Sequence, residues 1–265
     1  MSRYYLEVVC YKRPVLRLTQ RRVLAGAALL CLLPLTACGG SDDDTTLTVL
    51  AAASLTETFT ELGHEFEQQH DGVTVKFAFD SSATLAQQAT QGAPADVLAT
   101  ADQTTMDSAK SAQAETPQVF ATNVMVLATP ADNPAQIQKF SDLDKSSVKF
   151  VVCVPTAPCG KIGQALLEQN NITGKPVSQE VDVKSVLAKL TEGEADAGIV
   201  YTTDAVAAGD QVTTVAIPGT DQQTTTYPIV TLKQSDHEDL AQDFVDLVTG
   251  STGQQILQKA GFGNP

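Results

Sequence analysis

The sequence predicts an α/β fold divided into two lobes. Apolar strand-like runs alternate with amphipathic helix-like segments, a pattern typical of mostly parallel sheets flanked by helices. The alternation runs twice through about 220 residues, which are enough for two cores. Two long extended runs, near 120–130 and 224–232, are the expected crossings between lobes. We therefore expect a ligand cleft between the lobes, since two-lobed folds commonly close around a solute there.

The first 38 residues are predicted to be an export leader. The basic residues Arg13, Arg17, Arg21 and Arg22 precede a mostly apolar run, Val23–Leu33, which is short for a membrane span of about 20 residues. The segment LTAC that ends at Cys38 resembles the lipobox of bacterial lipoproteins. An ordinary secretory leader and a buried apolar helix are the alternatives. We predict a lipoprotein signal peptide over 1–38, lipidated at Cys38, and a tether over 39–46. The protein would then be extracytoplasmic and anchored to the cell membrane.

Without the leader the chain is strongly acidic. Its 17 basic and 31 acidic residues fall to 11 and 30, a net charge of −19, and every remaining basic residue is lysine. Nucleic-acid binding requires a concentrated basic face and is therefore not expected. An anion site would have no arginine, so backbone N–H groups and hydroxyls are the remaining donors.

The exported part retains two cysteines, Cys153 and Cys159, six positions apart. Outside the cytoplasm a disulfide between them is the first interpretation. A metal pair and two free thiols are the alternatives. No histidine accompanies the cysteines, and His64, His70 and His237 lack a ligand spacing such as i, i+4, so no metal cation site is predicted.

The chain after the tether opens with a strand, 47–53, that turns on Ser54 into an amphipathic helix. Ser54 and Glu57 have the form of a capping box, so Ser54 is the predicted N-cap. The free N–H groups and partial positive charge of a helix start suit a small anion. A serine that only caps its helix is the alternative.

The same strand, turn and helix unit recurs along the chain. Strands are expected over 73–79, 97–100, 118–129, 148–154, 197–201, 212–217 and 227–232. Helices are expected over 83–91, 104–112, 162–169, 183–192, 202–208, 237–247 and 253–260. Lobe 1 is predicted to comprise 47–126 and 228–265, and lobe 2 to comprise 127–227. Several helix starts at one cleft could bind a dianion at micromolar affinity or better, about −8 kcal/mol, without a cationic side chain.

Five segments resemble the ModA-type family, the periplasmic molybdate-binding proteins of ABC importers. They are TVLAAASL (48–55), SSATLAQQ (81–88), GAPADV (92–97), AGIVYTTDA (197–205) and QQILQKAGFG (254–263). The resemblance spans residues 47–263 and implies a two-lobed periplasmic-binding-protein fold of type II. It also implies a monomer without a cofactor that binds molybdate, and also tungstate, and delivers this oxyanion to an ABC permease with a cytoplasmic ATPase.

The resemblance implies a ligand set of two serine hydroxyls, two helix-start N–H groups and one tyrosine hydroxyl. These fall on Ser54, Ser82, Cys159, Val183 and Tyr201. Ser81 is the alternative to Ser82. The family has Pro-Ala-Gly where this chain has Pro158-Cys159-Gly160, but a backbone donor does not depend on its side chain.

Other readings of these residues remain open. Tyr201 could be a packing residue. Asp96 and Asp204 could be catalytic carboxylates, although caps or supports are the simpler interpretation. Lys161 could add positive potential, with a solvated side chain as the simpler case.

Other functions also remain open. The same architecture could bind sulfate, another oxyanion or a ferric complex, the last of which usually needs several Tyr, His or carboxylate ligands. A secreted hydrolase with Ser54 or Ser82 as nucleophile would need a base within reach, and the sequence has no G-x-S-x-G elbow. The sequence therefore predicts a binding protein and not an enzyme.

Overall fold

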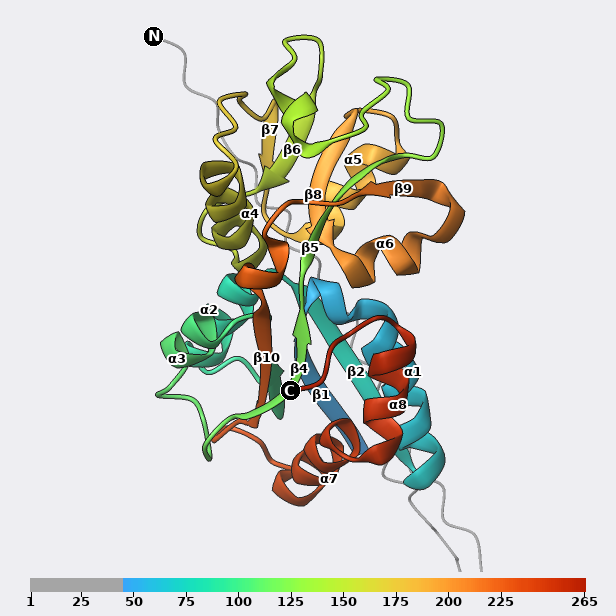
Figure 1. Ribbon diagram of the computed structural model, residues 1–265. Helices are drawn as coiled ribbons and strands as arrows, with labels where there is room; N and C mark the ends of the chain where they lie inside the picture. The colour runs from blue at the N-terminus through green and yellow to red at the C-terminus, as the bar shows by residue number, and fades with distance from the viewer. Residues whose placement is uncertain (1–44) are drawn as a thin grey trace, which may run out of the picture. The chain divides into compact units, whose positions relative to one another are not determined.

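The computed structural model describes residues 45–265, so the predicted leader, Cys38 and nearly all of the tether lie outside the described residues. The described chain forms two five-stranded sheets, each flanked by helices (Figure 1). The predicted α/β class with two lobes is confirmed. Among residues 45–265, none of the helices combines the length and the apolar character that crossing a bilayer requires.

The lower sheet in Figure 1 has the strand order β2-β1-β3-β10-β4. Its strands are β1 (Thr45–Ala52), β2 (Val73–Asp80), β3 (Val97–Ala99), β4 (Gln118–Asn123) and β10 (Thr225–Thr231). Its helices are η1 (Ala53–Leu55), α1 (Thr56–Gln69), α2 (Ser82–Thr90), α3 (Gln103–Ser108), α7 (Glu238–Thr249) and α8 (Ser251–Lys259). These helices cover both faces of the sheet.

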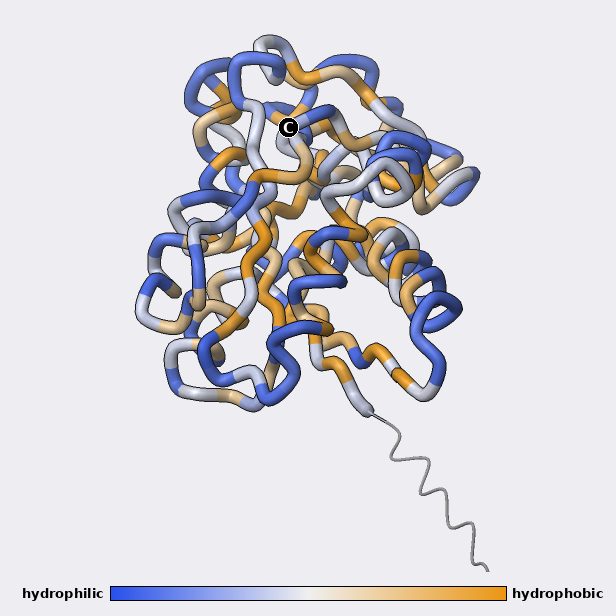
Figure 2. Tube along the Cα trace, turned by 90° about the horizontal axis from the view of Figure 1, so that it is seen from below, coloured by the Kyte–Doolittle hydropathy of each residue, from blue (hydrophilic) through white to orange (hydrophobic). Residues whose placement is uncertain are grey.

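The alternation of side chains along β1 divides its apolar residues between these two faces. Val49 belongs to the core that includes Phe59 of α1 and Phe244 of α7. Its neighbour Leu50 belongs to a separate core with Leu85 of α2. Because both faces are covered, β1 is almost continuously apolar, as expected of a buried parallel strand. In Figure 2 apolar segments run through the middle of the trace, while most of the outer turns are hydrophilic.

The upper sheet has the order β7-β6-β8-β5-β9. Its strands are β5 (Met125–Pro130), β6 (Phe150–Cys153), β7 (Ser178–Glu180), β8 (Ala197–Tyr201) and β9 (Val212–Val215). Its helices are η2 (Phe140–Asp144), α4 (Pro158–Gln169), α5 (Val183–Thr191), α6 (Thr202–Ala208), η3 (Gly209–Gln211) and η4 (Thr220–Gln223).

Each sheet is mixed, whereas the sequence predicted mostly parallel sheets. In the lower sheet β1 runs parallel to β2 and β3, but β10 runs antiparallel to β3 and β4. In the upper sheet β6 runs parallel to β7 and β8, but β5 runs antiparallel to β8 and β9. The difference arises because β5 and β10, which enter each sheet from the other lobe, run against their neighbours.

Two adjacent crossings join the lobes. Only Val124 separates β4 from β5, and the chain returns through η4 into β10. The hydroxyl of Thr220, in η4, donates to the backbone oxygen of Met125, 2.7 Å away, and so connects the return crossing to the outward one. Because of these paired crossings, the helix that follows β1 and the helix that follows β8 both begin between the lobes.

Candidate functional site

A small hollow lies between the two lobes and is lined from both of them. Its cavity volume is about 20 Å³, far below the roughly 300–1,000 Å³ typical of sites for drug-sized ligands. The lining residues are Ala52, Ala53, Ser54, Asp80, Ser81, Ser82, Ala101, Ala157, Pro158, Cys159, Asp182, Val183 and Tyr201. A hollow of this size suits an ion or a very small molecule.

The structure brings together all five residues that the sequence singled out. Ser54 lies in η1 after β1, and Ser82 is the first residue of α2, both in the lower lobe. Cys159 lies in the first turn of α4, Val183 begins α5, and Tyr201 ends β8, all in the upper lobe. Ser81, the alternative to Ser82, also lines the hollow. The placement is observed, and the binding role of each residue remains a prediction.

The predicted capping role of Ser54 is wrong. A 3-10 turn separates β1 from α1, so α1 begins at Thr56 with Leu55 as its N-cap, and no side chain caps it. The Ser54 hydroxyl instead lies 3.0 Å from the hydroxyl of Tyr227 on β10. Ser54 is therefore available to a ligand in a way that a capping serine would not be.

Ser82 has a fixed hydroxyl. Its Oγ accepts a hydrogen bond from the backbone N–H of Ala101, 3.0 Å away. A serine hydroxyl that accepts this bond still has its own hydrogen to donate. Because Ser82 is buried and lines the hollow, we expect that hydrogen to be offered to a bound ligand.

Tyr201 is fully buried, and its hydroxyl has no hydrogen-bond partner among residues 45–265. A buried polar group without a partner costs about 1–3 kcal/mol, which a ligand in the hollow could offset. Its ring meets that of Tyr227 edge to face, with centroids 6.0 Å apart. Burial raises the pKa of Tyr201 well above its ordinary value of 10.0, so the hydroxyl remains protonated and can only donate to an anion.

Three helices begin at the hollow. Ser82, Cys159 and Val183 belong to the first turns of α2, α4 and α5, where backbone N–H groups have no acceptor within the helix. Asp182 is the N-cap of α5, since it accepts from the backbone N–H of Ser185 at 2.8 Å. These N–H groups and their helix dipoles favour an anion.

The turn that presents Cys159 is held tightly. Cys159 forms a disulfide with Cys153 at the end of β6. Gly160 packs against the end of the same strand, where an added Cβ would lie 1.9 Å from the backbone oxygen of Val154. Only glycine allows this approach. The disulfide and the glycine together fix the position of the Cys159 N–H.

The lining of the hollow contains no cationic side chain, and its two charged residues are Asp80 and Asp182. Asp80 accepts from the N–H of Ser81 at 2.6 Å, and Asp182 caps α5. Both carboxylates thus form hydrogen bonds within their own turns. Selection for an anion in this hollow would depend on neutral donors.

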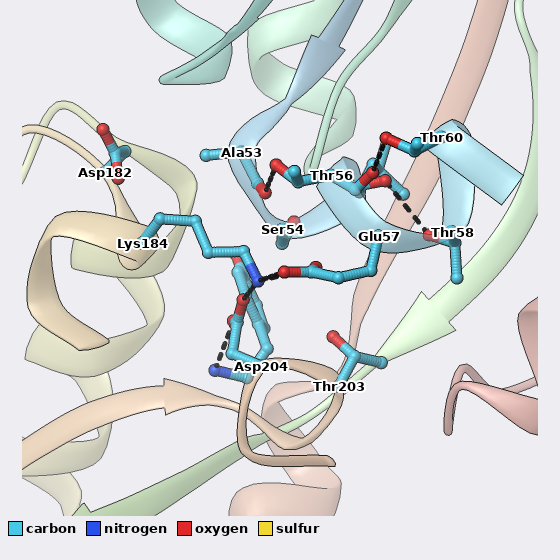
Figure 3. Close-up of polar contacts among 12 residues, drawn as sticks. Ala53, Ser54, Thr56, Glu57, Thr58, Thr60, Asp182, Lys184, Thr203 and Asp204 are labelled. Carbon is cyan, nitrogen blue, oxygen red and sulfur yellow. Dashed lines mark hydrogen bonds and ion pairs between the residues drawn. The ribbon is translucent and has the colours of Figure 1, made fainter. Parts of the chain in front are cut away.

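Two lysines near the hollow form ion pairs between the lobes. Lys161 of α4 lies 2.9 Å from Asp102, so its side chain is paired and not simply solvated. Lys184 of α5 lies 2.7 Å from Glu57 of α1 and 3.2 Å from Asp204 of α6 (Figure 3). The sequence alone does not indicate the second network, because its members lie in three separate segments.

Asp204 and Lys184 form the buried part of this network. Asp204 is completely buried, and burial raises its pKa to about 6 even though Lys184 lowers it. Burial alone would lower the pKa of Lys184, but the carboxylates of Asp204 and Glu57 raise it. Asp204 also accepts from the N–H of Tyr201 at 3.2 Å. It therefore supports the segment that carries Tyr201.

Asp96 has a supporting role as well. It accepts from the N–H of Thr48 and from the Ser235 hydroxyl, each at 2.6 Å, and so joins β1 to the segment before α7. Neither Asp96 nor Asp204 lines the hollow. The simpler interpretation of both carboxylates, as structural supports, therefore agrees with their contacts.

Two α/β lobes with a small hollow between them are the features of an extracellular solute-binding protein. The chain belongs to the bacterial extracellular solute-binding protein family, whose model matches residues 47–263. The molybdate-binding protein ModA of Mycobacterium tuberculosis is 42% identical over 221 residues, which cover 83% of this chain and 85% of the relative. The resemblance to ModA-type proteins is therefore confirmed.

Two solved structures share the fold. The periplasmic molybdate-binding protein of Azotobacter vinelandii has a TM-score of 0.74 at 20% identity, covering 83% of this chain and 99% of that one. The sulfate-binding protein SubI of Mycobacterium tuberculosis has a TM-score of 0.72 at 17% identity, covering 82% and 86%. The fold is thus shared by proteins named for different oxyanions, and the solute must be argued from the site.

Proposed function

We propose that the protein captures molybdate, and also tungstate, outside the cytoplasm and delivers it to an ABC permease that is driven by a cytoplasmic ATPase. The observation that supports this most is the buried hydroxyl of Tyr201, which lacks a partner in the described chain and lines the same hollow as Ser54 and Ser82. Hydroxyl and N–H donors suit a tetrahedral dianion because they donate without adding a counter-charge. The 42% identity to a molybdate-binding protein supports the same solute.

The proposed protein acts as a lipid-anchored monomer. Lipidation at Cys38 would hold the two lobes at the membrane surface, beside the permease. The chain needs no cofactor in this role. It is proposed not to be an enzyme: the lining of the hollow offers no histidine to activate Ser54 or Ser82 as a nucleophile.

Titration calorimetry on residues 41–265 tests the solute. Molybdate and tungstate should each bind with a Kd in the micromolar range or tighter, and a large excess of sulfate should not displace them. Displacement by sulfate would favour a general oxyanion site. The absence of binding heat with both metal oxyanions would contradict the proposed function.

Replacing Ser82 with alanine is expected to weaken molybdate binding by about 1–3 kcal/mol, roughly 5- to 150-fold, because a buried donor is lost. The neighbouring variant Ser81→Ala is the matched control and should change the Kd by less than about threefold. Calorimetry on both variants makes the comparison. A large loss in Ser81→Ala with none in Ser82→Ala would show that the wrong serine was chosen.

A further inference from the structure

Tyr227 and Asn123 are two buried polar residues outside the predicted ligand set. Neither of them lines the hollow. Tyr227 is the third residue of β10, on the return crossing, and Asn123 ends β4 at the outward crossing. Tyr227 is fully buried, and 4% of Asn123 is exposed. Buried polar side chains of this kind form a defined set of hydrogen bonds, so their donor and acceptor roles can be worked out.

The contacts of Asn123 fix the orientation of its amide. Its Oδ1 accepts from the N–H of Val124 at 2.9 Å, which places Nδ2 on the other side. Nδ2 then donates to Thr203 Oγ1 of α6 at 2.9 Å and to the Tyr227 hydroxyl at 3.4 Å. Both hydrogens of the amide are thus used, one toward each lobe.

The role of Tyr227 follows from that of Asn123. Its hydroxyl accepts from Asn123, so its single hydrogen needs an acceptor. The Ser54 oxygen, 3.0 Å away, is the partner that the structure provides for it. A buried donor left without an acceptor would cost about 1–3 kcal/mol, which favours donation from Tyr227 to Ser54 over the reverse. Burial also raises the pKa of Tyr227, so its hydroxyl keeps this proton.

The Ser54 hydroxyl then has one hydrogen left to donate, and the hollow is the direction open to it. Because Ser54 accepts from Tyr227, it does not need to donate in return, and its O–H is available to the hollow that it lines. The series Asn123, Tyr227 and Ser54 will be called the hydroxyl chain. Each member of the hydroxyl chain determines the direction in which the next member donates its hydrogen.

We propose that Tyr227 and Asn123 are positioning residues for oxyanion binding, which act by directing the Ser54 hydrogen into the hollow. This inference rests on the proposed function and extends it to two residues that do not line the site. The contact of Asn123 with Thr203 adds a second consequence. It ties the hydroxyl chain to α6, which follows Tyr201, so the hydroxyl donors of the two lobes are connected through the crossings.

A double-mutant cycle tests the proposal, with Tyr227→Phe, Ser54→Ala and both changes together titrated with molybdate. Tyr227→Phe removes only a hydroxyl, and Ser54→Ala removes the donor on which it acts. We expect each single variant to weaken binding about 10-fold or more. In the Ser54→Ala background, Tyr227→Phe should change the Kd by less than twofold, since its target is gone.

Thr129→Val is the matched control for loss of a buried hydroxyl. Thr129 is fully buried on β5, and its Oγ1 lies 2.8 Å from the hydroxyl of Thr213, outside the hollow. This variant should lower the Tm and leave the Kd unchanged. Should Tyr227→Phe fail to fold, Asn123→Leu enters the same cycle with Ser54→Ala, and the same dependence on Ser54 is expected.

The outcomes separate the inference from the proposed function. Binding of molybdate by the unaltered protein tests the proposed function alone. If it binds, but Tyr227→Phe keeps the original Kd or weakens binding equally with and without Ser54, the positioning role is overturned. If the unaltered protein binds neither molybdate nor tungstate, the proposed function fails first and the inference falls with it.

Discussion

Replacing Lys184 with methionine is expected to lower the free energy of unfolding by about 3–5 kcal/mol at pH 8. Lys184 lies 3.2 Å from the completely buried carboxylate of Asp204. Removing one partner of a buried ion pair leaves an uncompensated charge, which is the costly change in such pairs. Urea unfolding of both proteins, followed by circular dichroism, measures the difference.

The loss should be smaller at pH 5. The raised pKa of Asp204, about 6 against an ordinary 3.8, means that the folded protein binds more protons than the unfolded chain between these values. The contribution of Asp204 to stability is therefore greatest below pH 3.8 and falls by about 3 kcal/mol as the pH rises through about 6. Without Lys184 the pKa rises further, so at pH 5 the carboxyl is neutral and its burial costs less.

Two controls isolate the buried charge. Lys189→Met lies on the same helix, but Lys189 pairs with Glu194 at the surface, so a change below about 1 kcal/mol is expected. Glu57→Gln removes only the contact of Lys184 with the other lobe, and Glu57 is 54% exposed, so its effect should be similarly small. Equal losses in Lys184→Met and Lys189→Met would contradict the role assigned to Asp204.

Removing the disulfide with the pair Cys153→Ala and Cys159→Ala is expected to lower the free energy of unfolding by about 2–4 kcal/mol. Alanine is chosen because both positions are buried, and serine would introduce a polar group without a partner. Molybdate affinity should also fall several-fold, since the turn that presents the Cys159 N–H loses one of its two constraints. Urea unfolding and calorimetry measure the two effects separately.

A thiol reductant provides the control for the disulfide. It should lower the stability of the unaltered protein toward that of the double variant and leave the variant itself unchanged. If the variant unfolds at the same urea concentration and binds molybdate equally well, the disulfide has neither role. Loss of stability without loss of affinity would show that Gly160 alone fixes the turn.

The parts of the site that could be predicted from the sequence are local. Ser82 and Val183 each follow a strand and begin a helix, so a short segment is enough to place them. The capping box at Ser54 was also a local argument, and it failed because a 3-10 turn moves the N-cap of α1 by one residue, to Leu55. The predicted, mostly parallel strand pairing was partly wrong, since the direction of β10 depends on the path of the whole chain.

The parts that could not be predicted depend on contacts between distant segments. Tyr227 lies 173 positions after Ser54, and Lys184 lies 127 positions after Glu57. Nothing in the residues around either one indicates its partner. A weak signal existed for Tyr227: a tyrosine stood at the start of a predicted crossing strand, where a buried hydroxyl requires a partner.

Native mass spectrometry of residues 41–265 with equimolar molybdate, tungstate, sulfate and phosphate tests the central claim most directly. Sulfate and phosphate have nearly the same mass, but molybdate and tungstate differ from them and from each other, so a bound metal oxyanion is identified without a label. We expect a one-to-one adduct with molybdate or tungstate, and loss of that adduct in a protein carrying both Ser82→Ala and Tyr201→Phe. An adduct with sulfate or phosphate alone, or no adduct, would contradict the claim that these neutral donors select a metal oxyanion.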